Sequence, residues 1–128
     1  MDPVQIKLSR AELDRIYKDF DDEQSERIEL ALKDGESILA YASGLVEGRL
    51  FYLSDMWVDK SLRRQHHGSH LLAETEQLAL SHGCDEIYLW TAGEENKSFY
   101  LSNGYTQFVC FENSSHGKDR FGMRKSLS

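Results

Sequence analysis

The stretch Val58–Leu72, VDKSLRRQHHGSHLL, decides how this chain folds and where its chemistry is expected. It follows Leu50–Val58 (LFYLSDMWV), which predicts a central strand because residues on both of its faces are apolar. A helical pattern begins at Leu71, and a strand that ends in a basic, glycine-containing turn before a helix indicates an anion site. The N–H groups of the first helical turn lack partners, and the helix dipole favours negative charge there. Arg63 and Arg64 add positive charge to the turn.

The chain before this turn predicts a strand, a helix and a three-stranded antiparallel meander. Val4–Leu8 alternates between apolar and polar residues, which is typical of a short strand. Ser9 and Glu12 form a capping box for an amphipathic helix over about residues 10–20. Alternating apolar residues around Asp34-Gly35 predict a hairpin.

The chain after the turn alternates helices and strands. The predicted elements are a helix over Leu71–His82 ended by Gly83, a strand over Ile87–Ala92 that is buried on both faces, a short helix over about residues 96–102, and strands over Thr106–Phe111 and Phe121–Leu127 joined by the polar loop Glu112–Arg120. The order predicts a mixed α/β sheet in which the strands on either side of the first crossover helix are parallel.

Length and charge limit the classes of protein that fit. The 128 residues suit one domain, 1–128, and are too few for two. The net charge of −7 argues against a nucleic-acid-binding protein and is compatible with a cationic acceptor molecule. No window is apolar enough for a membrane span, and the N-terminus lacks the apolar run of a signal peptide, so we expect a cytoplasmic protein without a membrane partner. Cys84 and Cys110 are expected to be free thiols.

Three motifs in this order resemble those of the GNAT acetyltransferases. That family has a Gln/Arg-x-x-Gly-x-Gly/Ala turn after a valine and before a Leu-Leu pair. Arg63–Gly68 matches the turn, with Val58 before it and Leu71-Leu72 after it. Phe99-Tyr100 on the short helix and then Gly104-Tyr105 match the family's later motifs. The chain is therefore similar to GNAT enzymes over nearly its whole length.

The resemblance implies a fold and an activity. The fold is a GNAT-like single α/β domain with a mixed, mostly antiparallel sheet, whose central parallel strand pair is splayed around the cofactor and flanked by helices. The activity is transfer of an acetyl group from acetyl-CoA, the cosubstrate, to a primary amine of a small molecule or peptide by direct attack. A homodimer is common among such proteins.

The resemblance also implies roles for individual residues. Main-chain N–H groups of Arg64–Ser69 hold the pyrophosphate, and the pantetheine arm pairs with Met56–Val58, where a bulge leaves an N–H for the thioester carbonyl. Tyr100 protonates the departing thiolate. The implied cofactor-binding residues are Met56, Trp57, Val58, Arg63, Arg64, Gln65, His66, His67, Gly68, Ser69 and Asn96.

The chain departs from the family pattern in ways that leave alternatives open. His66 stands at the first glycine of the turn, Asn96 stands where an alanine is frequent, and Tyr52 stands where some relatives have a glutamate base. The general base is therefore unassigned, with Ser54 and Asp55 nearby. These departures support the alternative of a catalytically weak or inactive acetyl-CoA-binding sensor or interaction module.

A metal-binding module is the third hypothesis, since His66, His70 and Glu74 are spaced i, i+4, i+8. We expect no metal, because His66 is predicted to precede the helix and no fourth ligand is visible. The acceptor cleft implied by the resemblance is formed by about Asp14–Glu26 and Glu112–Arg120, which have no recognisable code.

Overall fold

The protein is represented by a computed structural model that describes residues 1–20 and 25–127. Its elements are α1 (Arg10–Tyr17), β1 (Glu26–Asp34), β2 (Ser37–Glu47), β3 (Leu50–Val58), a 3-10 turn (Lys60–Leu62), α2 (His67–Ser81), β4 (Glu86–Ala92), α3 (Glu94–Ser102), β5 (Thr106–Ser115) and β6 (Lys118–Ser126). Among the helices of these residues, none is both long and apolar enough to cross a membrane.

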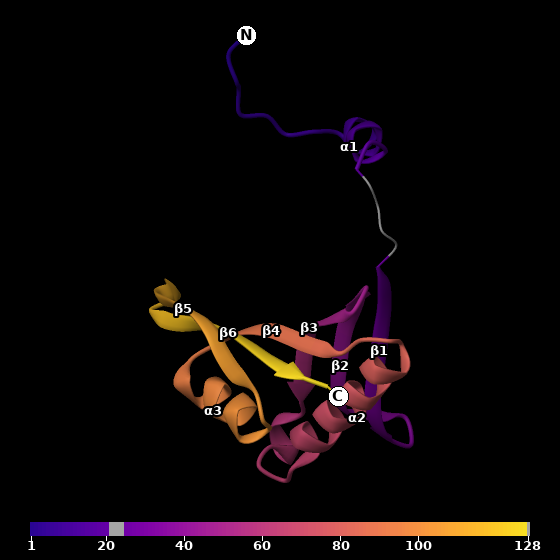
Figure 1. Cartoon of the computed structure of the whole chain (residues 1–128), viewed down its shortest axis with the longest axis vertical. Coiled ribbons are helices and arrows are strands. Elements are labelled where there is room, and N and C mark those ends of the chain that lie inside the picture. Colours follow the sequence, from indigo (N-terminus) through magenta and orange to yellow (C-terminus); the bar gives the residue numbers. More distant parts are fainter. Residues whose placement is uncertain (21–24, 128) are drawn as a thin grey trace.

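The strands described form one six-stranded sheet in the order β1-β2-β3-β4-β6-β5. The central pair β3–β4 is parallel and its neighbours pair antiparallel. Helix α2 packs on β1, β2 and β3, and α3 packs on β4, β5 and β6. Figure 1 shows both helices on the same side of the sheet. The predicted mixed sheet with a central parallel pair and flanking helices is confirmed.

The local signals of the sequence account for most of these elements. The β1–β2 hairpin turns at Gly35, whose φ of +61° suits glycine. Helix α2 buries the predicted apolar stripe and is followed by Gly83 at φ +86°. The hydrophobic core lies between the sheet and these helices and is built from residues such as Phe51, Leu71, Leu72, Ile87, Leu89, Phe121 and Met123.

Two predictions near the N-terminus differ from the structure. The predicted strand Val4–Leu8 is wrong, because this segment pairs with no strand in the described part of the chain and the side chain of Ile6 is 63% exposed. The capping box forms as predicted, with Ser9 N–H donating to Glu12 Oε1 at 3.0 Å and Glu12 N–H donating to Ser9 Oγ at 3.2 Å. Helix α1 ends at Tyr17, however, and none of its residues is buried. Figure 1 shows it apart from the sheet.

The predicted loop Glu112–Arg120 is also wrong. β5 continues to Ser115 and β6 begins at Lys118, so the connection is a tight turn at His116-Gly117. β5 is at the edge of the sheet, where polar side chains point into solvent without cost to the strand. For a similar reason β3 and β4 are not buried on both faces: only one face of each is covered by helices, and Trp57 on the other face is 43% exposed.

The β3–β4 pair is short and then opens. The two strands pair only at Leu50↔Glu86, Phe51↔Ile87 and Tyr52↔Tyr88, although β3 is nine residues long and β4 seven. Beyond Tyr52 the strands diverge, so the edge of β3 that faces β4 has no strand partner from Leu53 onward. The predicted splay of the central pair is confirmed, and it creates the space in which the candidate site lies.

Candidate functional site

An open pocket of about 780 Å³ lies where β3 and β4 diverge. Its walls come from the end of β3, the turn that follows, the start of α2, β4 and α3. The lining residues are Met56, Trp57, Val58, Leu62, Arg63, Arg64, His66, Gly68, Ser69, Thr91, Glu95, Asn96, Phe99 and Tyr100. The pocket therefore gathers residues that are more than forty positions apart in the chain.

The start of α2 presents unpaired N–H groups to this pocket. The first backbone bond of the helix runs from His70 N–H to the carbonyl of His66 at 3.0 Å, so the N–H groups of His67, Gly68 and Ser69 have no acceptor within the helix. The cap residue His66 gives no side-chain hydrogen bond, and the first turn contains no acidic residue. These three N–H groups and the positive end of the helix dipole are thus available to an anion.

The turn before α2 is held against β3 and brings two arginines to the pocket. Arg63 Nε donates to the carbonyl oxygen of Val58 at 3.2 Å. Arg64 lies 3.9 Å from Glu95 Oε1, and both side chains are about 90% exposed. Arg64 and His66 adopt left-handed backbone conformations, with φ of +67° and +63°. A left-handed φ favours glycine, which gives a physical reason for the glycine that the family has where this chain has His66.

Gly68 allows α2 to approach α3 closely. A Cβ at this position would lie 3.3 Å from the ring of Phe99 and 3.5 Å from Val58. The missing side chain also leaves the N–H groups of the first helical turn accessible from the pocket. Gly68 therefore matters to this site for space, since its φ is not left-handed.

Tyr100 lies where α3 meets the end of β3. Its ring packs edge-on against Phe99 and Tyr105, its side chain is only 8% exposed, and its hydroxyl contacts Met56 Sδ at 3.9 Å. Burial raises the pKa of the Tyr100 phenol to about 12. The phenol is therefore protonated at neutral pH, and Tyr100 lines the pocket.

A β-bulge lies on β3, although not where it was expected. Gly44 pairs with Leu53 and Ser43 pairs with Asp55, so Ser54 is the extra residue. Gly44 allows this, because a Cβ there would collide with the Phe51 ring and the Tyr52 carbonyl oxygen. The prediction of a bulge at Met56–Val58 is wrong by two residues or more, since pairing with β2 is regular over that stretch.

The structure brings most of the predicted cofactor-binding residues to the pocket. Gln65 and His67 are the exceptions, because neither contributes to the lining. The side chain of Asn96 donates to the carbonyl oxygen of Ala92 at 2.9 Å. Sequence reasoning missed Leu62, Thr91 and Glu95, which carry no motif, and assigned no role to Phe99, which the Phe-Tyr pair already marked.

The residues of the metal hypothesis do not form a metal-binding cluster in the described part of the chain. Helix α2 begins at His67, so His66 precedes it and does not share a helix face with His70 and Glu74. In residues 1–20 and 25–127, no three His, Cys, Asp or Glu side chains come together in a way that could hold a metal ion.

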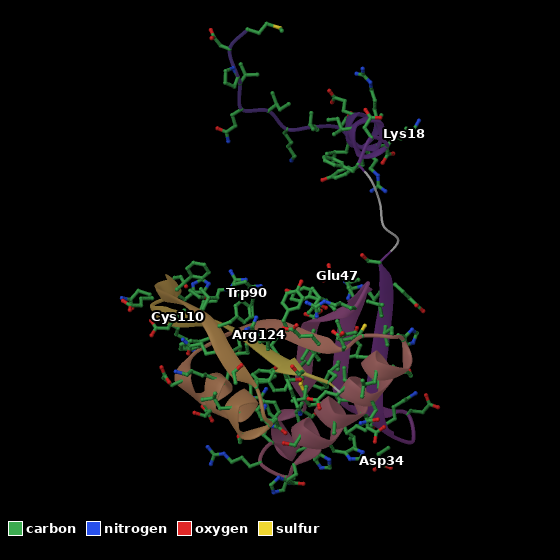
Figure 2. The ribbon with its side chains drawn as sticks, in the orientation of Figure 1. Lys18, Asp34, Glu47, Trp90, Cys110 and Arg124 are labelled. Carbon is green, nitrogen blue, oxygen red and sulfur yellow. The ribbon has the colours of Figure 1, made fainter. Side chains whose placement is uncertain are left out.

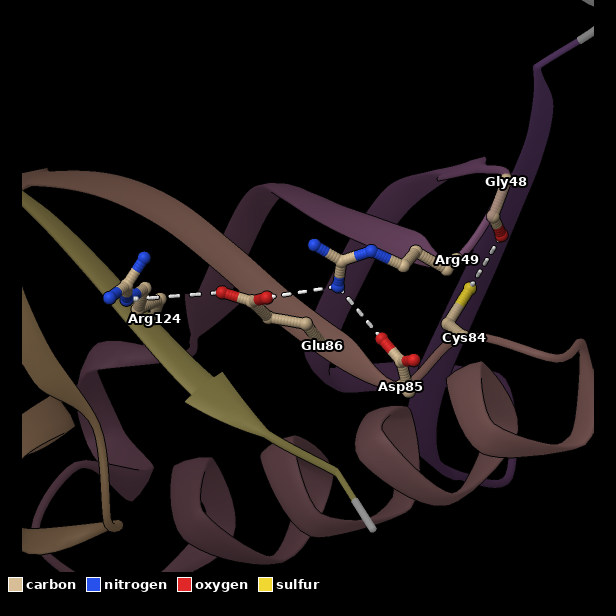
Figure 3. A network of polar contacts seen from close by, with 6 residues as sticks. All are labelled: Gly48, Arg49, Cys84, Asp85, Glu86 and Arg124. Atoms are coloured by element: carbon tan, nitrogen blue, oxygen red, sulfur yellow. Dashed lines mark hydrogen bonds and ion pairs between the residues drawn. The ribbon is translucent and has the colours of Figure 1, made fainter.

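The opposite end of the β3–β4 pair is closed by polar contacts (Figure 3). Arg49 donates to Asp85 Oδ1 at 2.9 Å and to Glu86 Oε1 at 3.1 Å, and Asp85 N–H donates to the Arg49 carbonyl at 2.8 Å. Cys84 is buried behind these groups, and burial raises the pKa of its thiol. Both cysteines, Cys84 and Cys110, are free thiols.

Comparison with known proteins agrees with this arrangement. Residues 3–105 match the sequence model of the acetyltransferase (GNAT) family. An acetyltransferase from Bacillus cereus has a similar structure, with a TM-score of 0.82, 25% identity and 97% of both chains covered. An aminoglycoside 6'-N-acetyltransferase complexed with coenzyme A has a TM-score of 0.74 and 21% identity, over 80% of this chain and 74% of that chain.

The ribosomal-protein-S18-alanine N-acetyltransferase of Escherichia coli has a TM-score of 0.72 and 19% identity, over 89% of this chain and 76% of that chain. Among curated proteins, no sequence matches at a significant level. The family match covers most of the chain, and the turn before α2 and the Phe99-Tyr100 pair both contribute residues to one pocket between the splayed strands. This chain belongs to the GNAT acetyltransferase family.

Proposed function

We propose that the protein is an N-acetyltransferase that transfers the acetyl group of acetyl-CoA to a primary amine by direct attack. One observation carries the proposal: a single pocket in the β3–β4 split has an uncapped helix start at one end and a buried, protonated phenol at the other. A similar structure, the aminoglycoside 6'-N-acetyltransferase, was determined with coenzyme A, which supports the choice of cosubstrate.

The residues of the pocket fit the parts of acetyl-CoA. The N–H groups of Gly68 and Ser69, which line the pocket, would bind the pyrophosphate, with Arg63 and Arg64 adding attraction at longer range. The unpaired edge of β3 at Met56–Val58 would bind the extended pantetheine amides as an added strand would. Asp59 N–H donates to the Leu39 carbonyl on β2, so Trp57, two residues earlier, also turns its backbone groups toward β2. The free groups of the open edge are therefore those of Met56 and the N–H of Val58, since the Val58 carbonyl accepts from Arg63.

Tyr100 would donate its proton to the sulfur as the C–S bond breaks. Its hydroxyl lies beside Met56 at the deep end of the pocket, and its raised pKa keeps the proton available at neutral pH. A donor whose pKa is well above the thiol's transfers its proton only as negative charge develops on sulfur, which is the behaviour of a general acid. Ser54 and its neighbours make a bulge on the same strand, whose free N–H would polarise the thioester carbonyl.

The acceptor is proposed to be the primary amine of a small molecule or a peptide. The aminoglycoside and ribosomal-protein enzymes with similar structures act on these two kinds of acceptor. A cytoplasmic location goes with the proposal, because both cysteines are free thiols as in a reducing compartment. A homodimer stays a prediction that the oligomeric state in solution would test.

The second candidate function is an acetyl-CoA-binding module with little or no activity. The left-handed backbone of His66 favours it, because a side chain here crowds the approach to the helix start that glycine would leave open.

Two measurements separate these candidates. Titration with acetyl-CoA at low and high salt tests the site, and we expect binding that weakens with salt because screening reduces the attraction of the pyrophosphate. Thiol release with a panel of amines and peptides tests catalysis. Binding without thiol release from any acceptor would favour the module, and absence of binding would contradict both.

A further inference from the structure

Residues 1–20, which we call the N-terminal arm, expose apolar side chains. None of the residues of α1 is buried, although Ile16, Tyr17 and Phe20 follow helical spacing. All three side chains are exposed, and the rings of Tyr17 and Phe20 pack on each other with their centroids 5.2 Å apart. Ahead of the helix, the side chains of Val4 and Ile6 are exposed as well. The arm therefore carries an apolar surface that has no cover in the described part of the chain.

Helix α1 is too short to be stable without a surface to pack on. It has eight residues, whereas helices shorter than about 12–15 residues are marginal in water. Its capping box satisfies backbone N–H groups only at Ser9 and Glu12. Figure 2 shows α1, marked by Lys18, standing apart from the sheet of its own chain. The surface that α1 needs is therefore expected on another molecule.

The sheet presents aromatic rings on the side that α2 and α3 leave uncovered. Tyr52, Tyr88 and Trp90 each follow a residue that is buried in the core, so their side chains lie on the opposite side. The rings of Tyr52 and Tyr88 stack at 5.0 Å, and Trp90 packs on Phe108 and Phe111 at 5.8 and 5.9 Å. Figure 2 shows Trp90 on this uncovered side. We call the surface of these five residues the aromatic face.

The bulge at Ser54 extends the aromatic face along β3. Beyond this extra residue, Met56 and Val58 pack against the core under the helices. Asp55 and Trp57 therefore project from the uncovered side. Trp57 is exposed, as are the two phenylalanines of the aromatic face. Exposed rings gathered on one face in this way are typical of a surface that binds another molecule.

The sequence of the two central strands also calls for a second cover. Leu50–Val58 and Ile87–Ala92 are apolar on both faces, which is typical of strands that are buried on both sides. Within one chain, only the face under α2 and α3 is covered. A second molecule on the aromatic face would remove this disagreement between the sequence pattern and the structure.

The acetyltransferase from Bacillus cereus indicates that the arm has a defined place. The match covers 97% of this chain, so it includes most of the N-terminal arm. Residues 25–127 are about four-fifths of the chain, and at 25% identity their superposition alone would not give a TM-score of 0.82. Part of the arm therefore lies alike in the two proteins, which a segment without contacts would not do.

We propose that the protein forms a dimer in which the N-terminal arm of each copy packs on the aromatic face of the other. A second copy fits because it brings both an apolar arm and an aromatic face, so that two identical contacts form about a two-fold axis. Stable interfaces of standard size use about 20–30 residues on each side, and one arm together with one aromatic face reaches that number. The exchange of arms goes beyond the proposed acetyl transfer and does not depend on it.

The test measures the oligomeric state of the full chain and four variants by analytical ultracentrifugation. Ile16→Glu puts a charge on the apolar side of α1, and Phe111→Lys puts one on the aromatic face. Leu101→Glu on α3 and Ile38→Lys on β2 are matched controls outside both surfaces, with side chains 45% and 49% exposed against 44% for Ile16 and 50% for Phe111. None of these four side chains is buried, so thermal melting should show that every variant folds.

We expect the parent and both controls to be dimers. Ile16→Glu and Phe111→Lys should each raise the Kd of the dimer by roughly a hundredfold or more, because a symmetric dimer buries each new charge twice. A monomeric parent would overturn the proposal. A dimer that is lost in only one of the two variants would overturn it too, since it would indicate that arms pair with arms or faces with faces.

A mixture of the two weakened variants tests the exchange directly. In a dimer of Ile16→Glu with Phe111→Lys, one contact is unaltered and the other sets the new glutamate against the new lysine. With a fluorescent label on one variant, we expect association at concentrations at which each variant alone is monomeric. No association in the mixture would overturn the reciprocal arrangement.

Discussion

The two ends of the β3–β4 pair are built in opposite ways. At the closed end, three residue pairs are joined by backbone bonds, and Arg49 ties the turn before β3 to Asp85 and Glu86 on the chain entering β4 (Figure 3). At the open end the strands part, and the gap between them is bordered by a helix start, a phenol and an unpaired strand edge. One pair of strands thus holds the centre of the sheet together at one end and opens into a pocket at the other.

The two ends of the strand pair therefore have different roles: the closed end stabilises the fold, and the open end can bind a ligand. Core residues such as Phe51 and Ile87 fill the closed end, whereas the open end leaves backbone groups without partners, which a folded protein tolerates where a ligand or water takes their place. Changes at the open end are therefore expected to affect binding or turnover, or to relieve local backbone strain, and changes at the closed end to affect stability alone. Four substitutions test this, taken from the largest expected effect to the smallest.

Gly68→Asp should abolish acetyl-CoA binding. The new carboxylate would stand in the first turn of α2, where it repels the pyrophosphate and accepts from the N–H groups that would bind it. An acidic residue in the first helical turn favours the helix, so folding should persist. Titration calorimetry with acetyl-CoA, together with thermal melting, checks this expectation.

Gly68→Ala is the matched control for this change. Its Cβ would meet the Phe99 ring at 3.3 Å, a distance that a small shift relieves, so binding should weaken only modestly. If the Gly68→Asp variant bound acetyl-CoA as tightly as the parent, the pyrophosphate would have to bind at another site.

Tyr100→Phe should reduce turnover by roughly 10² or more, the range for one general acid. The ring and its contacts with Phe99 and Tyr105 remain, so acetyl-CoA affinity and thermal stability should be nearly unchanged. Because burial raises the pKa of Tyr100 to about 12, its ionisation should not lower kcat of the parent between neutral pH and about pH 11. Steady-state rates across this pH range decide, and full activity of the variant would remove Tyr100 from the mechanism.

His66→Gly should leave CoA affinity level or improved and should raise the free energy of unfolding by about 1 kcal/mol. The gain comes from relief of a left-handed conformation that costs a non-glycine residue about that much. His67→Gly is the control, since His67 is helical and glycine there should be destabilising. A large loss of affinity in His66→Gly, measured by titration, would mean that the imidazole itself contacts the ligand.

Arg49→Ala, at the closed end, should have the smallest effect. Its ion pairs with Asp85 and Glu86 are exposed, and exposed pairs contribute little. The melting temperature should fall by no more than a few degrees, while KM for acetyl-CoA and kcat stay as in the parent. A fall in kcat as large as that of Tyr100→Phe would contradict the division between the two ends.

Much of the fold was predictable because its signals are local. The capping box at Ser9, the Asp34-Gly35 turn and the stripe of α2 each act within a few residues, and each forms as predicted. The predictions failed for segments whose structure depends on whether a distant strand pairs with them. Val4–Leu8 alternates between apolar and polar residues like a strand, yet it pairs with no strand in the described part of the chain. The polar stretch Glu112–Arg120 becomes a hairpin because β6 supplies hydrogen-bond partners for the backbone of β5.

The candidate site divides in the same way. The turn Arg63–Ser69 and the Phe99-Tyr100 pair were recognisable from residue types and spacing, and both line the pocket. Thr91 and Glu95 were not recognisable, because their place in the lining depends on how far β4 and α3 stand from β3. The position of the bulge also escaped sequence reasoning, since an extra residue is defined only by the register of the partner strand.

The sequence by itself determined most of the elements, the basic turn before α2 and the phenol on α3, because periodicity, capping and turn chemistry are properties of neighbouring residues. Only the tertiary structure decided that β3 and β4 part after Tyr52, that Tyr100 is buried beside Met56, and that Asp55 faces the uncovered side of the sheet. The physical reason is that splay, burial and facing direction depend on pairing between distant strands, and a one-residue shift in that pairing sends every following side chain to the other face.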